Sequence, residues 1–175
     1  MNLDWDFSLV NVDGTLVSLS GYPDARGFIV IFSCNHCPYV IASEERIKEL
    51  DRRYTPLGFP LIAISSNDVA QYPQDSFEQM QVRAREKEFH FPYLYDESQE
   101  VARRYGAERT PHAFVLLRRA GELHLIYKGA IDNSPRDPAK VTERYLAPFL
   151  DRLIETEEAE YQEVAAIGCT VKWKL

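Results

Sequence analysis

Two cysteines separated by two residues, Cys34-Asn35-His36-Cys37, are the residues of this chain best placed to do chemistry. They follow the apolar run of residues 28–32 and precede a stretch patterned as an amphipathic helix. A helix N-terminus presents unpaired N–H groups and a partial positive charge, which stabilise a thiolate at the first sulfur. The spacing lets the second sulfur attack a mixed disulfide formed at the first. We therefore expect dithiol–disulfide exchange, with Cys34 more exposed than Cys37 and with a Cys34 pKa below the free value of about 8.5.

Other uses of a cysteine pair can be weighed against the rest of the sequence. A structural zinc site needs four ligands, commonly two such pairs or one pair with two histidines. The chain has no second cysteine pair, although His36 and Cys169 could contribute ligands. The other histidines lie far from the motif in sequence and lack the spacing of zinc ligands: His90, His112 and His124. A structural disulfide needs an oxidising compartment, which nothing in the sequence indicates. Redox use is therefore favoured over a metal site or inert buried thiols, and we expect neither a metal nor a cofactor.

The composition is that of one acidic globular domain. The 175 residues carry a net charge of −7, which argues against nucleic acid or an anionic membrane as a partner. No apolar run approaches the ~18 residues of a membrane span. The first six residues have neither the basic region nor the apolar core of a secretory leader. We expect a single cytoplasmic domain over residues 1–175.

The hydrophobic pattern alternates between strand and helix signals. Asp13-Gly14 predicts a hairpin within residues 1–20, and residues 28–32 and 61–64 read as buried strands. Pro38 opens the first helix, and Asp75 or Ser76 caps a second that runs to about residue 88. The remaining expected elements are a short helix from Ser98 to Tyr105, strands at 113–117 and 123–127, a helix over 141–153, and a tail over 155–175. This order predicts an α/β fold with a mixed sheet covered on both faces and a site at the end of the first central strand.

Taken together, these motifs resemble the thioredoxin superfamily, and more closely its small thioredoxin/peroxiredoxin-like redoxin proteins. The matching stretches are residues 32–40, 66–68, 91–102, Tyr105-Gly106, Thr110-Pro111, 131–133 and 167–174. The resemblance implies a thioredoxin fold with an N-terminal hairpin extension, Cys34 as nucleophile and Cys37 as resolving thiol. It also implies a cis peptide at Thr110-Pro111 that faces the motif and helps to bind the substrate. A cis bond is nearly confined to proline, although an ordinary trans proline at the start of a strand is the alternative.

Two features depart from the family pattern. Ser33 stands where thioredoxins usually carry tryptophan, and residues 28–32 contain no carboxylate that could relay a proton. Glu44 and Glu45 are predicted to face outward, so proton transfer is expected to run through water or His36. His36 could stabilise the Cys34 thiolate, or it could be a solvated loop residue. We interpret Asn35 as a small polar turn residue and a second hydrogen-bond donor.

Three functions compete. The first is a thiol-disulfide oxidoreductase whose partners are protein or small-molecule disulfides and thiols together with a reductant. The second is a peroxidase, but Cys34 occupies the place of the peroxiredoxin threonine, Val30 that of its proline, and only Arg109 is a possible activating arginine. The third is a non-catalytic redox-sensing module. Cys169 either anchors the tail or serves as an alternative resolving cysteine, and Gly168 and Trp173 indicate that the tail is docked.

Overall fold

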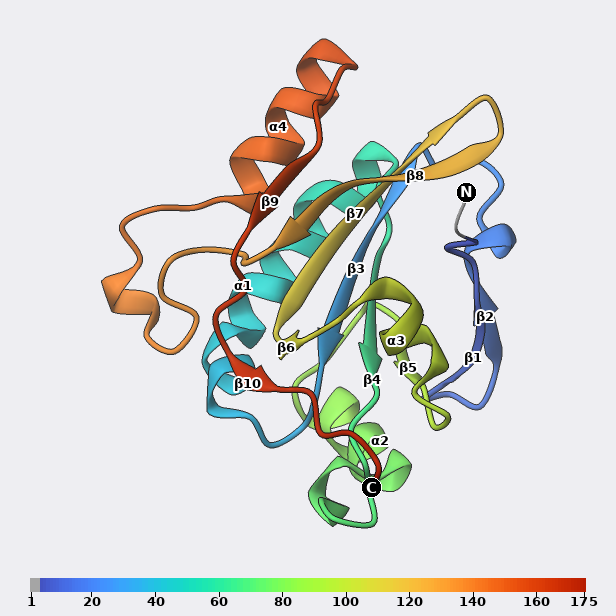
Figure 1. Cartoon of the computed structure of the whole chain (residues 1–175), viewed down its shortest axis with the longest axis vertical. Coiled ribbons are helices and arrows are strands. Elements are labelled where there is room, and N and C mark those ends of the chain that lie inside the picture. The colour runs from blue at the N-terminus through green and yellow to red at the C-terminus, as the bar shows by residue number, and fades with distance from the viewer. Residues whose placement is uncertain (1–3) are drawn as a thin grey trace.

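A mixed β-sheet forms the centre of the molecule in the computed structural model, which describes residues 4–175 (Figure 1). The strand order is β2-β1-β5-β4-β3-β7-β8-β9, and a separate two-stranded sheet joins β10 to β6. The strands are β1 (Ser8–Asn11), β2 (Leu16–Ser18), β3 (Gly27–Ser33), β4 (Leu61–Ser65), β5 (Tyr93–Tyr95), β6 (Arg109–Thr110), β7 (His112–Arg119), β8 (Glu122–Gly129), β9 (Gln162–Val164) and β10 (Cys169–Thr170).

Four α-helices of the described chain flank this sheet. They are α1 (Pro38–Tyr54), α2 (Phe77–Glu86), α3 (Glu100–Tyr105) and α4 (Leu146–Thr156). Pro38 occupies the first turn of α1, and the Ser76 hydroxyl caps α2 by accepting a hydrogen bond from the Gln79 N–H, both as the sequence predicts. The last predicted helix begins later than expected, because the Asn133 side chain binds the backbone of residues 142 and 143 and holds them in a loop.

Strand β3 contributes side chains to the hydrophobic core on both faces of the sheet, because successive side chains of a strand point to opposite faces. Ile29 and Ile31 pack with the helices α1 and α4, whereas Phe28, Val30 and Phe32 pack on the other face with α3 and the N-terminal segment. All seven residues of β3 are buried, as expected for a central strand with both faces covered. Its C-terminal end is thereby fixed, and the cysteine motif follows directly.

The predicted mixed sheet, N-terminal hairpin and docked tail are confirmed. Strand β3 pairs in parallel with β4 and antiparallel with β7, and the β1–β2 hairpin extends the sheet through β5. The tail returns along the molecule, adds β9 to the far edge beside β8, and then places β10 against β6 (Figure 1). No helix between residues 4 and 175 combines the length and the apolar character needed to cross a membrane.

Asp96 joins the end of β5 to the start of α3. Its buried carboxylate accepts hydrogen bonds from the Ser66 hydroxyl at 2.7 Å and from the Ala102 N–H at 2.9 Å. The Val101 N–H donates to the same side chain at 3.3 Å. One carboxylate therefore satisfies the first turn of α3 and the loop after β4, and a negative charge suits a helix N-terminus.

We predict that Asp96→Ala lowers the free energy of unfolding by about 2–4 kcal/mol, because it leaves these buried donors without an acceptor. Chemical denaturation followed by circular dichroism measures the change. The neighbouring Glu97 is exposed, so Glu97→Ala is the matched control and is expected to stay within about 0.5 kcal/mol of the wild type. Equal losses in the two variants would contradict the structural role of Asp96.

Candidate redox site

The cysteine motif forms the loop between β3 and α1, and Cys37 is the N-cap residue of α1. Cys34 and Cys37 are both only 1% exposed, so the prediction that Cys34 is the more accessible thiol is wrong for this state. The reason is the C-terminal tail, whose Cys169 packs against both of them. The motif lies at the end of the strand as predicted, and the docked tail, which was also predicted, places Cys169 against it.

The sulfur pairing differs from the expected one. Cys37 forms a disulfide with Cys169 across 132 residues of sequence, with the two Cα atoms 6.4 Å apart. Cys34 is left as a free, buried thiol. The site in this state is therefore one thiol beside one disulfide rather than a Cys34–Cys37 pair.

Thr110 lies against the sulfurs from the other side. Its hydroxyl is 3.8 Å from Cys34 Sγ, and its carbonyl oxygen is 3.6 Å from Cys37 Sγ. The Thr110–Pro111 peptide bond is cis in the structure. The topology thus brings together two segments more than 70 residues apart, as the resemblance implied.

Asp75 is the residue of this site that the sequence analysis treated only as a candidate helix cap. It is fully buried, and its carboxylate accepts hydrogen bonds from the Asn35 N–H at 2.8 Å and from the Asn67 side chain at 2.9 Å. Its Oδ2 atom also lies 2.6 Å from His36 Nδ1. No spacing rule connects residue 75 to residue 34, so only the folded chain shows that a carboxylate stands beside the motif.

Asn35 and His36 are held by the loop that carries Asp75. The Asn35 side chain donates to the Gln74 carbonyl at 2.9 Å and accepts from the Tyr93 hydroxyl at 2.8 Å, so it fastens the motif rather than pointing into solvent. The His36 ring stacks on Tyr72 with 5.3 Å between centroids and is partly buried. The picture of His36 as a solvated loop residue is therefore wrong.

Ligand atoms of Cys34, His36 and Asp75 all lie within 4.8 Å of one another. Sulfur, imidazole nitrogen and carboxylate oxygen are donors that a divalent transition metal accepts. Both Asp75 oxygens, however, already accept hydrogen bonds from Asn35 and Asn67. The site therefore brings a thiol, an imidazole and a carboxylate together, and the carboxylate is already hydrogen-bonded.

Burial raises the pKa of the Cys34 thiol to about 11, and the nearby Asp75 carboxylate adds to this effect. The N–H groups of Cys37 and His36 and the Thr110 hydroxyl act in the opposite direction. The predicted lowering of the Cys34 pKa is thus wrong in this state. The donors that the motif supplies do favour the thiolate, but the loss of hydration outweighs them.

A second buried carboxylate stands behind the motif. Glu44 is turned inward from α1 and forms an ion pair with Arg83 of α2, with Arg83 Nε 2.7 Å from a Glu44 oxygen. The expectation that Glu44 faces outward is wrong because α2 offers it a cation, whereas Glu45 is exposed as expected. Glu44 lines a small cavity together with Ser33 and Tyr93.

Arg109, considered above as a peroxide-activating group, lies on the outside of this site. Its side chain is directed to the tail, where Nη1 is 3.5 Å from the Gly168 carbonyl oxygen. The residue is exposed, in contrast to its neighbour Thr110.

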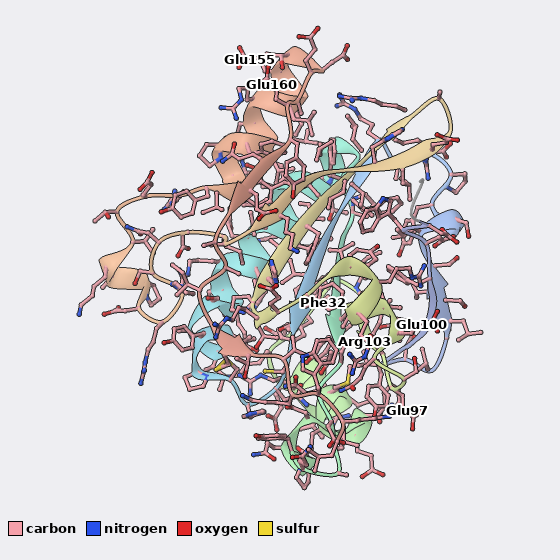
Figure 2. The ribbon with its side chains drawn as sticks, viewed as in Figure 1. Phe32, Glu97, Glu100, Arg103, Glu155 and Glu160 are labelled. Carbon is pink, nitrogen blue, oxygen red and sulfur yellow. A yellow bond between two sulfur atoms is a disulfide. The ribbon has the colours of Figure 1, made fainter. Side chains whose placement is uncertain are left out.

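We predict that Asp75→Asn lowers the pKa of Cys34, because it removes a negative charge that opposes the thiolate. The measurement is the Cβ chemical shift of 13C-labelled cysteine as a function of pH, with the Cys37–Cys169 disulfide intact. Glu160→Gln serves as control, since Glu160 lies at the end of the molecule away from Phe32 and the motif (Figure 2). A Cys34 pKa that is the same in both variants would remove Asp75 as a cause.

A second prediction concerns His112, the buried first residue of β7. Its Nδ1 accepts a hydrogen bond from the Glu108 N–H at 3.1 Å, and burial, with Lys128 adding to it, lowers the pKa of His112 from 6.5 to about 4. A lowered pKa in the folded state means that stability present above pH 6.5 is lost as the pH falls toward 4, by up to about 3 kcal/mol.

Denaturant unfolding between pH 7 and pH 4 tests this prediction. His112→Asn, which keeps an acceptor, should flatten the loss of stability, whereas the exposed His90→Asn should not. Parallel pH profiles for the wild type and His112→Asn would show that another group is responsible.

Comparison with known proteins agrees with this geometry. Residues 4–143 match the Redoxin family. The structure of an uncharacterized conserved protein from Geobacillus kaustophilus is similar to this chain, with 38% identity, a TM-score of 0.86, and coverage of 97% of this chain and 89% of that one. The structure of a hypothetical protein from Sinorhizobium meliloti 1021 is 30% identical to this chain, with a TM-score of 0.85. The match covers 97% of this chain and 91% of that one.

More distant structures share the fold alone. The exposed lipoprotein thioredoxin of Streptococcus pneumoniae strain TIGR4 is 21% identical, with a TM-score of 0.56 over 68% of this chain and 85% of that one. No curated protein matches the chain. The family match supports a thiol-redox function, without specifying the reaction. The position of the cysteine motif directly after central strand β3 agrees with it. The chain belongs to the Redoxin family, and its fold is similar to that of a thioredoxin.

Proposed function

We propose that this protein is a thiol-disulfide oxidoreductase that exchanges a Cys34–Cys37 dithiol or disulfide with protein or small-molecule thiols and disulfides. One observation carries the proposal: a free thiol, Cys34, packs beside a disulfide-bonded Cys37 at the end of β3. Thiol–disulfide exchange needs these two sulfur species in contact. The family match supports the same chemistry at a coarser level.

Cys34 is the proposed attacking thiol. In the reductive direction, once an external thiol or dithiol reductant has opened the Cys37–Cys169 disulfide, the Cys34 thiolate attacks one sulfur of the substrate disulfide, forms a mixed disulfide and releases one substrate thiolate. Cys37 then attacks Cys34, which forms the Cys34–Cys37 disulfide and releases the second substrate thiolate. Two electrons have passed to the substrate, and an external thiol or dithiol reductant must restore the pair.

Asp75 is the proposed acceptor for the proton that Cys34 loses, with His36 as its partner. The supporting geometry is the group of three ligand atoms within 4.8 Å and the 2.6 Å contact between His36 and Asp75. This carboxylate replaces the route through water or His36 alone that the sequence favoured. Thr110 and Pro111 form the proposed docking edge for the substrate, since Thr110 lies beside both sulfurs.

The test is insulin reduction with dithiothreitol as reductant, beside a peroxide-consumption assay. Cys34→Ser is expected to fall to the uncatalysed rate. In a separate incubation of the reduced protein with insulin after dithiothreitol has been removed, the double variant Cys37→Ser/Cys169→Ser should accumulate a mixed disulfide between Cys34 and insulin, because neither second sulfur remains to resolve it. Non-reducing electrophoresis and mass spectrometry detect this species.

The matched control is Cys34→Ser/Cys169→Ser, which retains Cys37 and should trap nothing. Trapping by the control instead of the test variant would reverse the roles of the two cysteines. Peroxide consumption that depends on Cys37, without insulin reduction, would identify a peroxidase. A wild-type protein that shows neither insulin reduction nor peroxide consumption would leave the non-catalytic redox-sensing module as the better description.

A further inference from the structure

The C-terminal tail occupies the edge of the site as an added β-strand. Strand β10 pairs antiparallel with β6, with Cys169 opposite Thr110 and Thr170 opposite Arg109. The Val171 N–H extends this ladder by donating to the Glu108 carbonyl at 3.1 Å. Main-chain pairing at an exposed edge is the way many proteins recognise an extended peptide, so the chain binds its own tail in that manner.

Gly168 lets this tail approach the site closely. A Cβ atom at position 168 would lie 2.2 Å from the Thr110 carbonyl oxygen and 2.8 Å from the Thr110 carbonyl carbon. These are backbone atoms and cannot swing aside, so a larger residue would push the strand away. Glycine at this place therefore sets the distance at which Cys169 meets Cys37.

Residues beyond Cys169 are held by several separate contacts. The Lys172 N–H donates to the Asn67 side chain at 2.9 Å, and the Lys172 carbonyl accepts from the Asp68 N–H at 2.8 Å and from Gln99 at 2.9 Å. Val171 is buried in the core cluster on the α3 face of the sheet. The tail is thus bound specifically along its length, as a folded-in ligand would be.

Trp173 completes the contact on the surface of the molecule. The guanidinium of Arg103, on α3, lies 4.4 Å from the centroid of the Trp173 ring. Arg103 and Glu100 both belong to α3, three residues apart (Figure 2). Both side chains are exposed, and of the two only Arg103 stacks on the tail within the described residues, so Arg103 serves as the test residue and Glu100 as its neighbouring control.

We propose that Cys169 is a third exchange cysteine and that the tail, defined as residues 168–174, is a strand released by exchange with Cys34. The inference rests on the thiol chemistry proposed above for Cys34 and Cys37. The Cys34 thiolate attacks Cys37 Sγ, the Cys34–Cys37 bond forms, the Cys37–Cys169 bond breaks, and Cys169 leaves as a thiolate. The proton lost by Cys34 is taken up by Cys169, so this rearrangement needs no external oxidant or reductant.

The two resulting states have different properties. In the closed state Cys34 is buried and the edge of β6 is filled by the tail. In the open state the disulfide bond that holds the tail is broken. The Cys34–Cys37 disulfide then faces the free edge of β6, which a substrate cysteine can reach. The raised pKa of Cys34 in the closed state agrees with a latent form, because burial keeps the thiol protonated.

The first experiment maps the sulfur that N-ethylmaleimide traps at pH 8 in the oxidised wild-type protein, without substrate. Trypsin releases Cys34 and Cys37 in one peptide, residues 27–46, and Cys169 in another, residues 153–172. The closed form therefore gives a linked peptide pair, and the open form gives one peptide with an internal disulfide and an alkylated Cys169.

Alkylated Cys169 together with the internal disulfide is expected to accumulate in the wild type but not in Cys34→Ser. Alkylation of Cys34 alone, with the linked pair intact at all times, would overturn the proposal. The same result in wild type and Cys34→Ser would overturn it as well, because Cys169 would then be released without Cys34.

The second experiment measures hydrogen exchange at the Val171 and Lys172 amides. These amides should exchange at least tenfold faster in Cys169→Ser and in the reduced wild type than in oxidised Cys34→Ser. Equal protection in all three would show that the tail is a permanent part of the fold and would overturn its release. Arg103→Ala should speed Cys169 alkylation about two- to fivefold, the effect of losing one exposed cation–π contact.

Glu100→Ala is the control and should leave the alkylation rate unchanged; equal rates in Arg103→Ala and Glu100→Ala would count against release as part of the exchange. Insulin reduction is assayed separately. Internal exchange without insulin reduction would uphold this inference while the proposed function fails, and insulin reduction with a static Cys37–Cys169 bridge would do the reverse.

Discussion

Thr110 is the point on which the site depends, because three segments distant in sequence meet at this one residue. Its hydroxyl contacts Cys34, its carbonyl oxygen contacts Cys37, and its backbone pairs with Cys169. Strand β7, which follows at once, lies antiparallel to β3, so Thr110 is held at the same end of the sheet as the motif. A shift of the Thr110 backbone would alter all of these sulfur contacts at once. This backbone is held on one side by buried strand β7 and on the other by the tail, which approaches so closely that position 168 has no room for a side chain.

The environment around Cys34 opposes its ionisation rather than promoting it. Asp75 is buried next to a thiol that is itself removed from water, and Glu44, a second buried carboxylate, is paired with Arg83. A buried carboxylate without donors would be costly, but Asp75 accepts from Asn35 and Asn67, and the Glu44 charge is matched by Arg83. Both carboxylates are therefore stable as buried charges. The pKa of Cys34 is raised by burial of the thiol and, in addition, by the negative charge of Asp75. In such a site the thiol is unreactive while it is buried, because it stays protonated, and it becomes more nucleophilic when water reaches the sulfur.

Local patterns in the sequence were enough for the scaffold and for part of the site. The apolar run of β3, Pro38 at the start of α1 and Ser76 at the cap of α2 each depend on neighbours within a few residues, and the structure agrees with all three. The sulfur pairing and the role of Asp75 depend instead on contacts across 132 and 40 residues. Periodicity and spacing carry no information about such contacts, because the partner is chosen by the topology of the sheet and not by the adjacent chain. Glu44 illustrates the same limit, since a helical charge faces inward only when another helix supplies its counterion.

The arrangement of three sulfurs also explains why a disulfide at Cys37 is compatible with a motif built for exchange. Cys37 is the N-cap residue of α1 and packs in one cluster with Cys34 of its own loop and Cys169 of the tail, so both sulfurs that could bond to it lie in its surroundings. The core clusters are formed by β3, the helices and the N-terminal segment, and of the tail residues from 168 onward only Val171 and the partly buried Trp173 join one of them. Releasing the tail therefore exposes little apolar surface, so the hydrophobic contribution to the free-energy difference between the two pairings is small. The fold supplies a frame at Thr110 and, beside it, a strand held by hydrogen bonds and one disulfide, and the bonding partner of Cys37 is the variable that connects them.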